Sequence, residues 1–91
     1  MRLDKYLKVS RLIKRRTLAK EVAEAERIEV NGRTAKPAHQ IQPGDLITLH
    51  FGSRSLTVEV LLTEDHSRKA DAAFMYRVVE EISPVPESQT L

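Results

Sequence analysis

Apolar side chains in the first half of the chain recur with the spacing of helices. Intervals of three and four residues separate most members of the first series: Leu3, Tyr6, Leu7, Val9, Leu12 and Ile13. This period predicts an amphipathic helix. Thr17 has the side chain of an N-cap and is followed by a second helical series. That series is rich in small residues, which favours close helix packing: Leu18, Ala19, Val22, Ala23 and Ala25. The expected core includes Leu3, Leu7, Leu12, Leu18 and Val22.

The period changes at residue 27 from helical spacing to alternation. Asn31-Gly32 predicts a type I′ hairpin turn, because both positions tolerate positive φ. Pro43-Gly44 is typical of a type II turn. We expect strands over 27–30, 33–35, 46–51 (mostly buried), 56–62 and 74–80. Residues 63–73 are expected to form an exposed loop or a short helical turn, and residues 83–91 a frayed tail.

Length and composition limit the class of protein. The 91 residues are enough for one domain, with 41% apolar and 31% charged residues, which is typical of globular proteins. The absence of cysteine excludes disulfides, thiolate metal sites and a cysteine nucleophile. No apolar stretch approaches the roughly 18 residues of a membrane span, and the start lacks the apolar segment of a signal peptide. We therefore expect a small cytoplasmic protein that does not bind membranes.

The net charge of +2 conceals an uneven distribution along the chain. Residues 1–20 contain eight basic side chains and one acidic side chain, a net charge of +7, whereas the remaining residues carry −5. Such asymmetry indicates a polyanionic partner on the basic side. The alternative is an ordinary solvated Lys/Arg face, and composition alone does not distinguish the two.

The sequence offers little for catalysis or for metal and cofactor binding. His39, His50 and His66 lack the tight spacing of common metal motifs. No serine lies in a nucleophile-elbow context, and the three glycines form no phosphate-binding run. We expect a protein that is not an enzyme and has no cofactor.

The basic residues instead fit phosphate binding, because Lys and Arg contact phosphate oxygens by charge and hydrogen bonds. Tyr6 has core spacing, so backbone recognition of structured RNA is favoured over base stacking. We expect Arg16 to be the strongest single contact, because it precedes the Thr17 cap and is expected to point from a loop. The candidate RNA-binding residues are Arg2, Lys5, Lys8, Arg11, Lys14, Arg15, Arg16, Lys20 and Lys36.

Four ordered blocks resemble the S-four-type (S4) RNA-binding domain, also called the αL motif: residues 2–7, residues 11–19, Val30-Asn31-Gly32 with Lys36-Pro37, and Pro43-Gly44-Asp45. The resemblance covers about residues 1–52, with 53–82 expected to complete the same sheet and 83–91 to form a flexible tail. It implies an α+β fold with two N-terminal helices on a small bent antiparallel sheet. The helical face and its adjoining loop would bind RNA. Asp4 looks like the family's usual aspartate, expected to cap the helix or to orient Arg2 or Lys5.

Two stand-alone groups of this family are similar to the chain. Residues 11–21, the short strand-rich end and Met75-Tyr76 look most like the RqcP (YabO-like) ribosome quality-control factors. The bacterial heat-shock S-four proteins usually carry a longer basic extension, whereas the tail here is short and acidic.

The first likeness implies these partners: the large ribosomal subunit obstructed with peptidyl-tRNA, its rRNA, the P-site tRNA, and the RqcH factor that adds alanines to stalled chains. A monomer is expected. Recycling of obstructed subunits, as by the heat-shock group, is an alternative. Another is a protein-interaction module that uses edge strands at Leu56–Leu62 and Val78.

Overall fold

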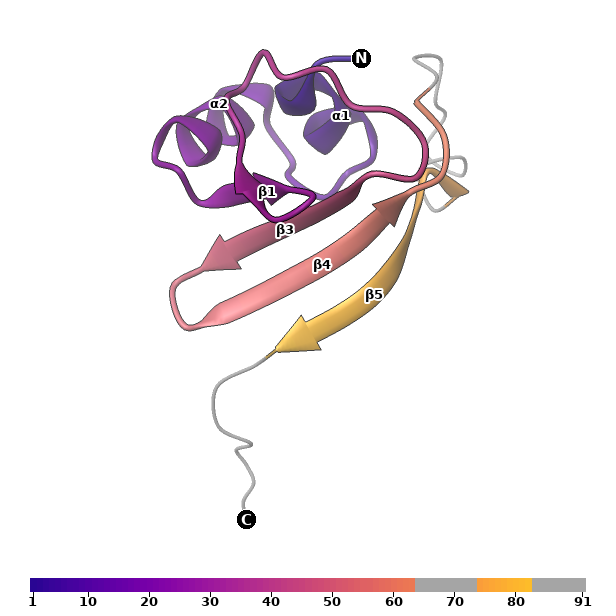
Figure 1. Ribbon diagram of the computed structural model, residues 1–91. Coiled ribbons are helices and arrows are strands. Elements are labelled where there is room, and N and C mark those ends of the chain that lie inside the picture. Colours follow the sequence, from indigo (N-terminus) through magenta and orange to yellow (C-terminus); the bar gives the residue numbers. More distant parts are fainter. Residues whose placement is uncertain (64–73, 83–91) are drawn as a thin grey trace.

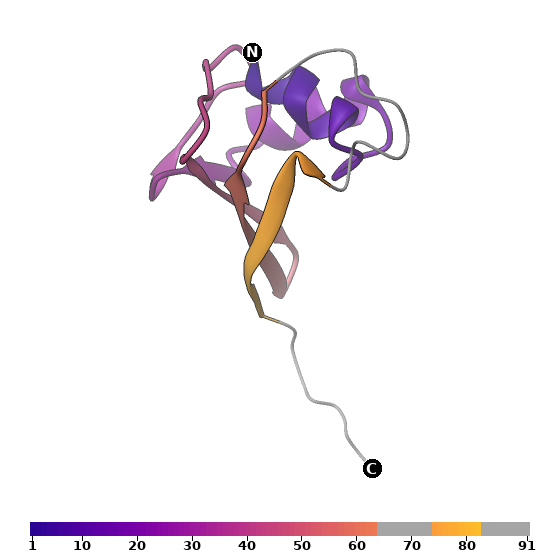
Figure 2. The ribbon, with the colours of Figure 1, turned by 90° about the vertical axis from the view of Figure 1, so that its right-hand side faces the viewer.

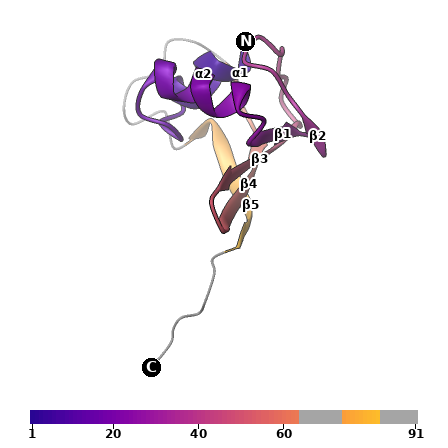
Figure 3. The same cartoon turned by 90° about the vertical axis from the view of Figure 1, so that its left-hand side faces the viewer.

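The computed structural model describes residues 1–63 and 74–82, which form two helices followed by five antiparallel strands (Figure 1). The strand order is β2-β1-β3-β4-β5. Figures 2 and 3 show both helices at one end of the sheet, with the β3–β4 hairpin and β5 extending past them. The elements are α1 (Leu3–Val9), α2 (Arg16–Glu24), β1 (Ile28–Val30), β2 (Arg33–Thr34), β3 (Leu46–Phe51), β4 (Arg54–Val60) and β5 (Tyr76–Ile82).

This architecture confirms the predicted α+β class with two N-terminal helices and an antiparallel sheet. The predicted tail at 83–91, and all but the first residue of the predicted loop at 63–73, lie outside the described residues. None of the described helices is long and apolar enough to cross a bilayer.

The core lies between the helices and one face of the sheet. Ile47 and Leu49 of β3 are fully buried beside Val58 and Val60 of β4, and they pack with Leu3, Leu7 and other helical residues. Strand alternation places the remaining β3 side chains at the surface or on the opposite, polar face. The prediction of a mostly buried β3 was therefore wrong, because helices do not cover both faces of this sheet.

Both predicted turns are present, and one side chain joins them. Asn31 and Gly32 have φ values of 54° and 84°, as a type I′ turn requires. In the second turn, the Asp45 amide donates to the Gln42 carbonyl at 3.1 Å. Asn31 Oδ1 accepts from the Leu46 amide at 3.0 Å, and Asn31 Nδ2 donates to Asp45 Oδ1 at 3.2 Å. The two turns therefore stabilise each other.

The last two strands are displaced by two residues from their predicted ranges. β4 begins at Arg54, because the short Gly52-Ser53 turn allows Arg54 to pair directly with Phe51. β4 ends at Val60, and the amides of Leu61 and Leu62 instead donate to the Met75 carbonyl. β5 consequently starts at Tyr76, opposite Val60.

The first helix is shorter than its apolar period predicted. α1 ends at Val9, and Arg11 adopts a left-handed φ of 65°, which L-residues rarely continue as helix. The Ile13 amide then donates to the Leu7 carbonyl at 2.9 Å, so the chain folds back and buries Ile13. Arg11 therefore lies in a turn and not on the helical flank. Leu12 is partly buried against the core.

The second helix differs from the prediction at its start and on its surface. Arg15, not Thr17, occupies the N-cap position and makes no side-chain cap, and the helix already includes Arg16. Ala19 and Ala23 are buried as predicted. Leu18 is 48% exposed, so its core assignment was wrong: helical geometry turns it away from the side where Ala19 and Ala23 pack. Ala25 is also exposed, whereas Val22 packs partly against the core.

Candidate nucleic-acid interface

The start of α1 is fixed by a loop distant in sequence. The Leu3 amide donates to the His39 carbonyl at 2.8 Å, and the Asp4 amide donates to the Pro37 carbonyl at 3.1 Å. The Lys5 amide donates to Asp4 Oδ1 at 2.7 Å. The first three helical N–H groups therefore have partners within the protein, and this helix end is not an open anion site. Any anion bound nearby must be held by side chains.

Asp4 is the buried charge of this region, with a side chain only 3% exposed. Its Oδ1 accepts from Arg2 Nε at 3.1 Å, and its Oδ2 accepts from Arg2 Nη2 at 3.0 Å. The carboxylate thus orients Arg2 and satisfies the Lys5 amide, two of the roles proposed for it from sequence. Arg2 itself is 44% exposed, so one edge of a fixed guanidinium faces inward and the rest is accessible.

The structure places the candidate residues on α1, the connecting segment and α2. Lys8 lies in the last turn of α1, and Lys14 and Arg15 lie in the connection, all with exposed side chains. Lys20 is exposed on α2. No ion pair joins any of these four to another residue within 1–63 or 74–82. Their charge is therefore not cancelled by a neighbouring carboxylate in that part of the chain.

The remaining candidates occupy different settings. Lys5 is half-buried in α1, and Arg11 is exposed in the turn that follows it. Arg16 is the first residue of α2 and not a loop residue, which corrects the setting predicted for it. Lys36 is exposed in the segment just before Pro37, whose carbonyl holds the start of α1. Lys36 therefore adjoins the loop residue that contacts the start of α1.

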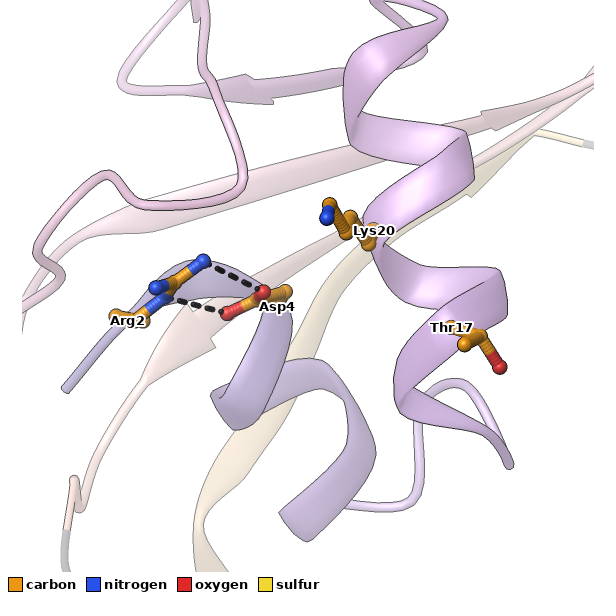
Figure 4. A pocket seen from close by; sticks show the side chains of 4 residues that line it. All are labelled: Arg2, Asp4, Thr17 and Lys20. Atoms are coloured by element: carbon orange, nitrogen blue, oxygen red, sulfur yellow. Dashed lines mark hydrogen bonds and ion pairs between the residues drawn. The ribbon is translucent and has the colours of Figure 1, made fainter.

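A shallow open pocket of about 300 Å³ joins the two helices and is lined by Arg2, Asp4, Thr17 and Lys20 (Figure 4). It brings together two candidate cations, Arg2 and Lys20, that are eighteen positions apart. Both residues were predicted from the sequence as RNA contacts, but no helical or strand period connects positions on two separate helices, so their proximity was not predictable. None of the other candidates whose side chains the structure describes lines this pocket.

Tyr6 is fully buried and its hydroxyl donates to the Met75 carbonyl. Burial, together with the nearby Tyr76, raises the pKa of Tyr6 above its ordinary value. The prediction that Tyr6 belongs to the core and is not a base-stacking platform is confirmed. This contact also ties α1 to the residue that precedes β5.

The histidines show no metal-binding arrangement in the described ranges. His50 Nε2 lies 3.2 Å from Glu29 Oε2, both partly exposed on neighbouring strands. No group of three or more His, Cys, Asp or Glu residues among those described could hold a metal ion, and His66 lies outside these ranges. The expectation of no metal or cofactor stays a prediction.

A family model described as the S4 domain matches residues 1–47, just over half of the chain. The chain belongs to the S4 domain family. This S4 protein is 54% identical over 81 residues to the RQC P-site tRNA stabilizing factor of Bacillus subtilis (strain 168), covering 89% of this chain and 94% of that relative. It is 34% identical over 82 residues to Heat shock protein 15 of Escherichia coli (strain K12), covering 89% and 62% respectively.

A solved structure supports the same assignment. The trimeric structure of Vibrio cholerae Heat Shock Protein 15 matches this S4 protein with a TM-score of 0.79 and 35% sequence identity, covering 87% of this chain and 81% of that one. The predicted fold class and the resemblance to both stand-alone groups are therefore confirmed.

Proposed function

We propose that this S4 protein is a non-enzymatic, cytoplasmic RNA-binding factor of the ribosome that acts in ribosome-associated quality control. It binds large-subunit rRNA and the P-site tRNA on large subunits obstructed with peptidyl-tRNA. There it supports the addition of C-terminal alanines by RqcH. The observation that carries this proposal is an unpaired cationic surface in a chain 54% identical, over most of its length, to an RQC P-site tRNA stabilizing factor.

The chemistry of the surface supports RNA-backbone binding. Lys8, Lys14, Arg15 and Lys20 are exposed cations that no described carboxylate neutralises, so they retain their attraction for phosphate. Arg2 adds a guanidinium held in a fixed orientation. Binding by about five such contacts makes the affinity fall steeply with salt, with a log–log slope of roughly −4. Lys5, Arg11, Arg16 and Lys36 are further candidate RNA contacts.

The sheet supports the helices and also limits the charge. The chain beyond residue 20 carries −5, which restricts non-specific attraction to RNA away from the helical surface. We therefore assign the binding surface to residues 1–52 and the completion of the sheet to the described part of 53–82, while 83–91 lie outside the described residues.

The test measures co-sedimentation of the protein with purified large subunits that carry peptidyl-tRNA, over a range of salt concentrations. The variant Lys14→Ala with Arg15→Ala is expected to bind at least about tenfold more weakly and to reduce the salt slope by about two. Its thermal unfolding should match the wild type, because both side chains are exposed. Salt-independent binding, or no binding by the wild type, would overturn the proposal.

Recycling of obstructed large subunits is a second candidate function, favoured by the 34% identity to Heat shock protein 15 and the TM-score of 0.79. Alanine tailing of stalled chains distinguishes the proposed function from this one. An extract depleted of this protein should lose tailing of stalled chains and regain it when wild-type protein is added. Normal tailing with accumulation of obstructed subunits would instead support the recycling function.

The exposed edge of the sheet favours a third candidate, a protein-interaction module. Val78, Val79 and Ile82 of β5 are each about half exposed, and β5 is an edge strand. The prediction of an edge strand at Leu56–Leu62 was wrong, because β4 lies between β3 and β5. Such a module would bind its partner after nuclease treatment and with little dependence on salt. The RNA-binding proposal requires the opposite result in both measurements.

A further inference from the structure

β5 forms one edge of the sheet and carries exposed apolar side chains there. It pairs with β4 on one side, and no strand of the described residues lies on its other side. An edge strand presents backbone N–H and C=O groups that no neighbouring strand satisfies. Val78, Val79 and Ile82 are each about half exposed. The edge therefore offers both hydrogen bonds and apolar contacts to an added strand.

A β-bulge changes which residues of β5 share a face. The register of β4 and β5 shifts between Thr57 and Val58, which leaves Val79 as an extra residue in β5. In a regular strand, residues three positions apart point to opposite faces. Across the bulge, Arg77 and Glu80 instead lie opposite residues two positions apart on β4, so both point to the same face. The bulge therefore places one cation and one anion on the same face of the edge strand.

A second copy of β5 is complementary to this edge when the two strands run antiparallel about a twofold axis. With the axis between Val78 and Val79, Arg77 of each copy lies opposite Glu80 of the other. The two side chains are on the same face, as a direct antiparallel pair requires. The valines of both copies meet at the axis. This register therefore combines two ion pairs with a central apolar contact.

The neighbouring register lacks this complementarity. Moving the axis onto Val79 would place Arg77 opposite Glu81 of the other copy. Arg77 lies opposite Glu59 and Glu81 lies opposite Leu56, which are three positions apart on β4. The two side chains therefore point to opposite faces of the sheet, and they do not form a direct pair in that register.

Both charged partners are accessible for a contact between copies. Glu80 is exposed and forms no ion pair with another described residue. Arg77 Nε donates to Glu59 Oε1 at 2.7 Å, but the Arg77 side chain is 62% exposed. Its other N–H groups have no acceptor among the described residues. Arg77 can therefore contact Glu59 of its own copy and Glu80 of the other copy together.

We propose that β5 is the interface through which two copies of this chain associate into a twofold-symmetric dimer. The sheets of the two copies join into one continuous antiparallel sheet, with the Arg77–Glu80 pairs on either side of the valines. β5 contains none of the candidate RNA-binding residues, so this inference goes beyond the proposed function and does not depend on it. The monomer expected from the sequence is the form at low concentration.

The experiment measures the mass of the free, nuclease-treated protein by sedimentation equilibrium. The wild type is expected to pass from monomer to dimer as its concentration is raised to about 1 mM, where even weak association is detected. Glu80→Lys and Arg77→Glu each place like charges opposite one another twice in the dimer. Each variant alone should therefore dimerise at least about tenfold more weakly than the wild type.

An equimolar mixture of the two variants separates a contact between copies from a loss of folding. In the mixed dimer, the native Arg77 of one copy lies opposite the native Glu80 of the other. The lysine introduced at position 80 lies opposite the glutamate introduced at position 77. Both pairs are again complementary, so the mixture should dimerise about as tightly as the wild type. Unfolded variants would not recover association on mixing.

Glu59→Gln is the matched control within one copy. It removes the carboxylate that holds Arg77 internally but leaves Arg77 and Glu80 in place, so it should dimerise at least as tightly as the wild type. The proposal is overturned if the wild type stays monomeric over the whole concentration range. It is also overturned if the single variants dimerise like the wild type, or if their mixture associates no more tightly than each variant alone.

Discussion

The helical half and the sheet of this protein differ in how their basic residues are paired. In the sheet, Arg77 Nε lies 2.7 Å from Glu59 Oε1, and Arg54 Nη2 lies 3.8 Å from Glu81 Oε2. In the helical half, Lys8, Lys14, Arg15 and Lys20 form no ion pair within the described ranges. Arg2 is paired, but with a buried carboxylate that leaves its outer edge accessible.

This difference indicates that the positions of the carboxylates, more than the number of cations, distinguish the proposed RNA-binding surface from the sheet. Exposed ion pairs contribute little to stability, but each one cancels a charge that would otherwise attract phosphate. Residues 1–20 contain eight basic side chains and the rest of the chain contains seven, yet the net charges are +7 and −5. Arg54 and Arg77 of the sheet are thereby neutralised locally, whereas the exposed cations of the helical surface named above are not.

The largest expected effect comes from reversing charges in the two regions. Lys8→Glu with Lys14→Glu should weaken binding to obstructed large subunits by about a hundredfold or more, because four charge units change on the phosphate-binding surface. Arg54→Glu with Arg77→Glu makes the same change in the sheet and should alter affinity less than about threefold. Equal losses in the two variants, measured by co-sedimentation at fixed salt, would show that only net charge matters.

An intermediate effect is expected where the two regions are joined. Tyr6→Phe removes the hydrogen bond to the Met75 carbonyl and should lower the free energy of unfolding by about 1–2 kcal/mol, measured by urea denaturation. RNA binding should be unchanged under conditions where the variant is folded.

The same variant tests the pH dependence. Burial raises the pKa of Tyr6, so the folded state retains the proton that the unfolded state releases above about pH 10. The stability contribution is complete below that pH and is lost as pH rises through the pKa of the folded state. Tyr6→Phe should flatten this alkaline loss, and identical pH profiles for both proteins would contradict the assignment.

The smallest expected effect is at a paired cation of the sheet. Arg77→Ala removes an exposed ion pair with Glu59 and should cost less than about 1 kcal/mol of stability, with no measurable change in RNA affinity. Glu59→Gln breaks the same pair and serves as its partner variant in urea denaturation and co-sedimentation. A tenfold loss of affinity for Arg77→Ala would extend the RNA-binding surface onto β5 and remove the contrast between the regions.

Local patterns explain what was predictable in the fold. Asn31-Gly32 forms its type I′ turn because the requirement for positive φ is a property of those two residues alone. Leu12 and Ile13 were predicted to continue the first helix. The helix instead ends before them, because the chain turns at Arg11, whose φ is positive, and folds back toward the core. Leu18 was misplaced because apolar character does not specify which side of a helix meets its neighbour.

The amino-acid sequence by itself determined the cationic half, the two helices, the alternating strands and both turns. Charge density, helical period and turn chemistry are local properties that neighbouring residues express without distant partners. The tertiary structure alone decided that Asp4 is buried against Arg2, that Lys20 of the second helix shares a pocket with Arg2, and that Arg54 and Arg77 of the sheet are paired. Those arrangements depend on distances between separate elements, which are set when the helices pack on the sheet.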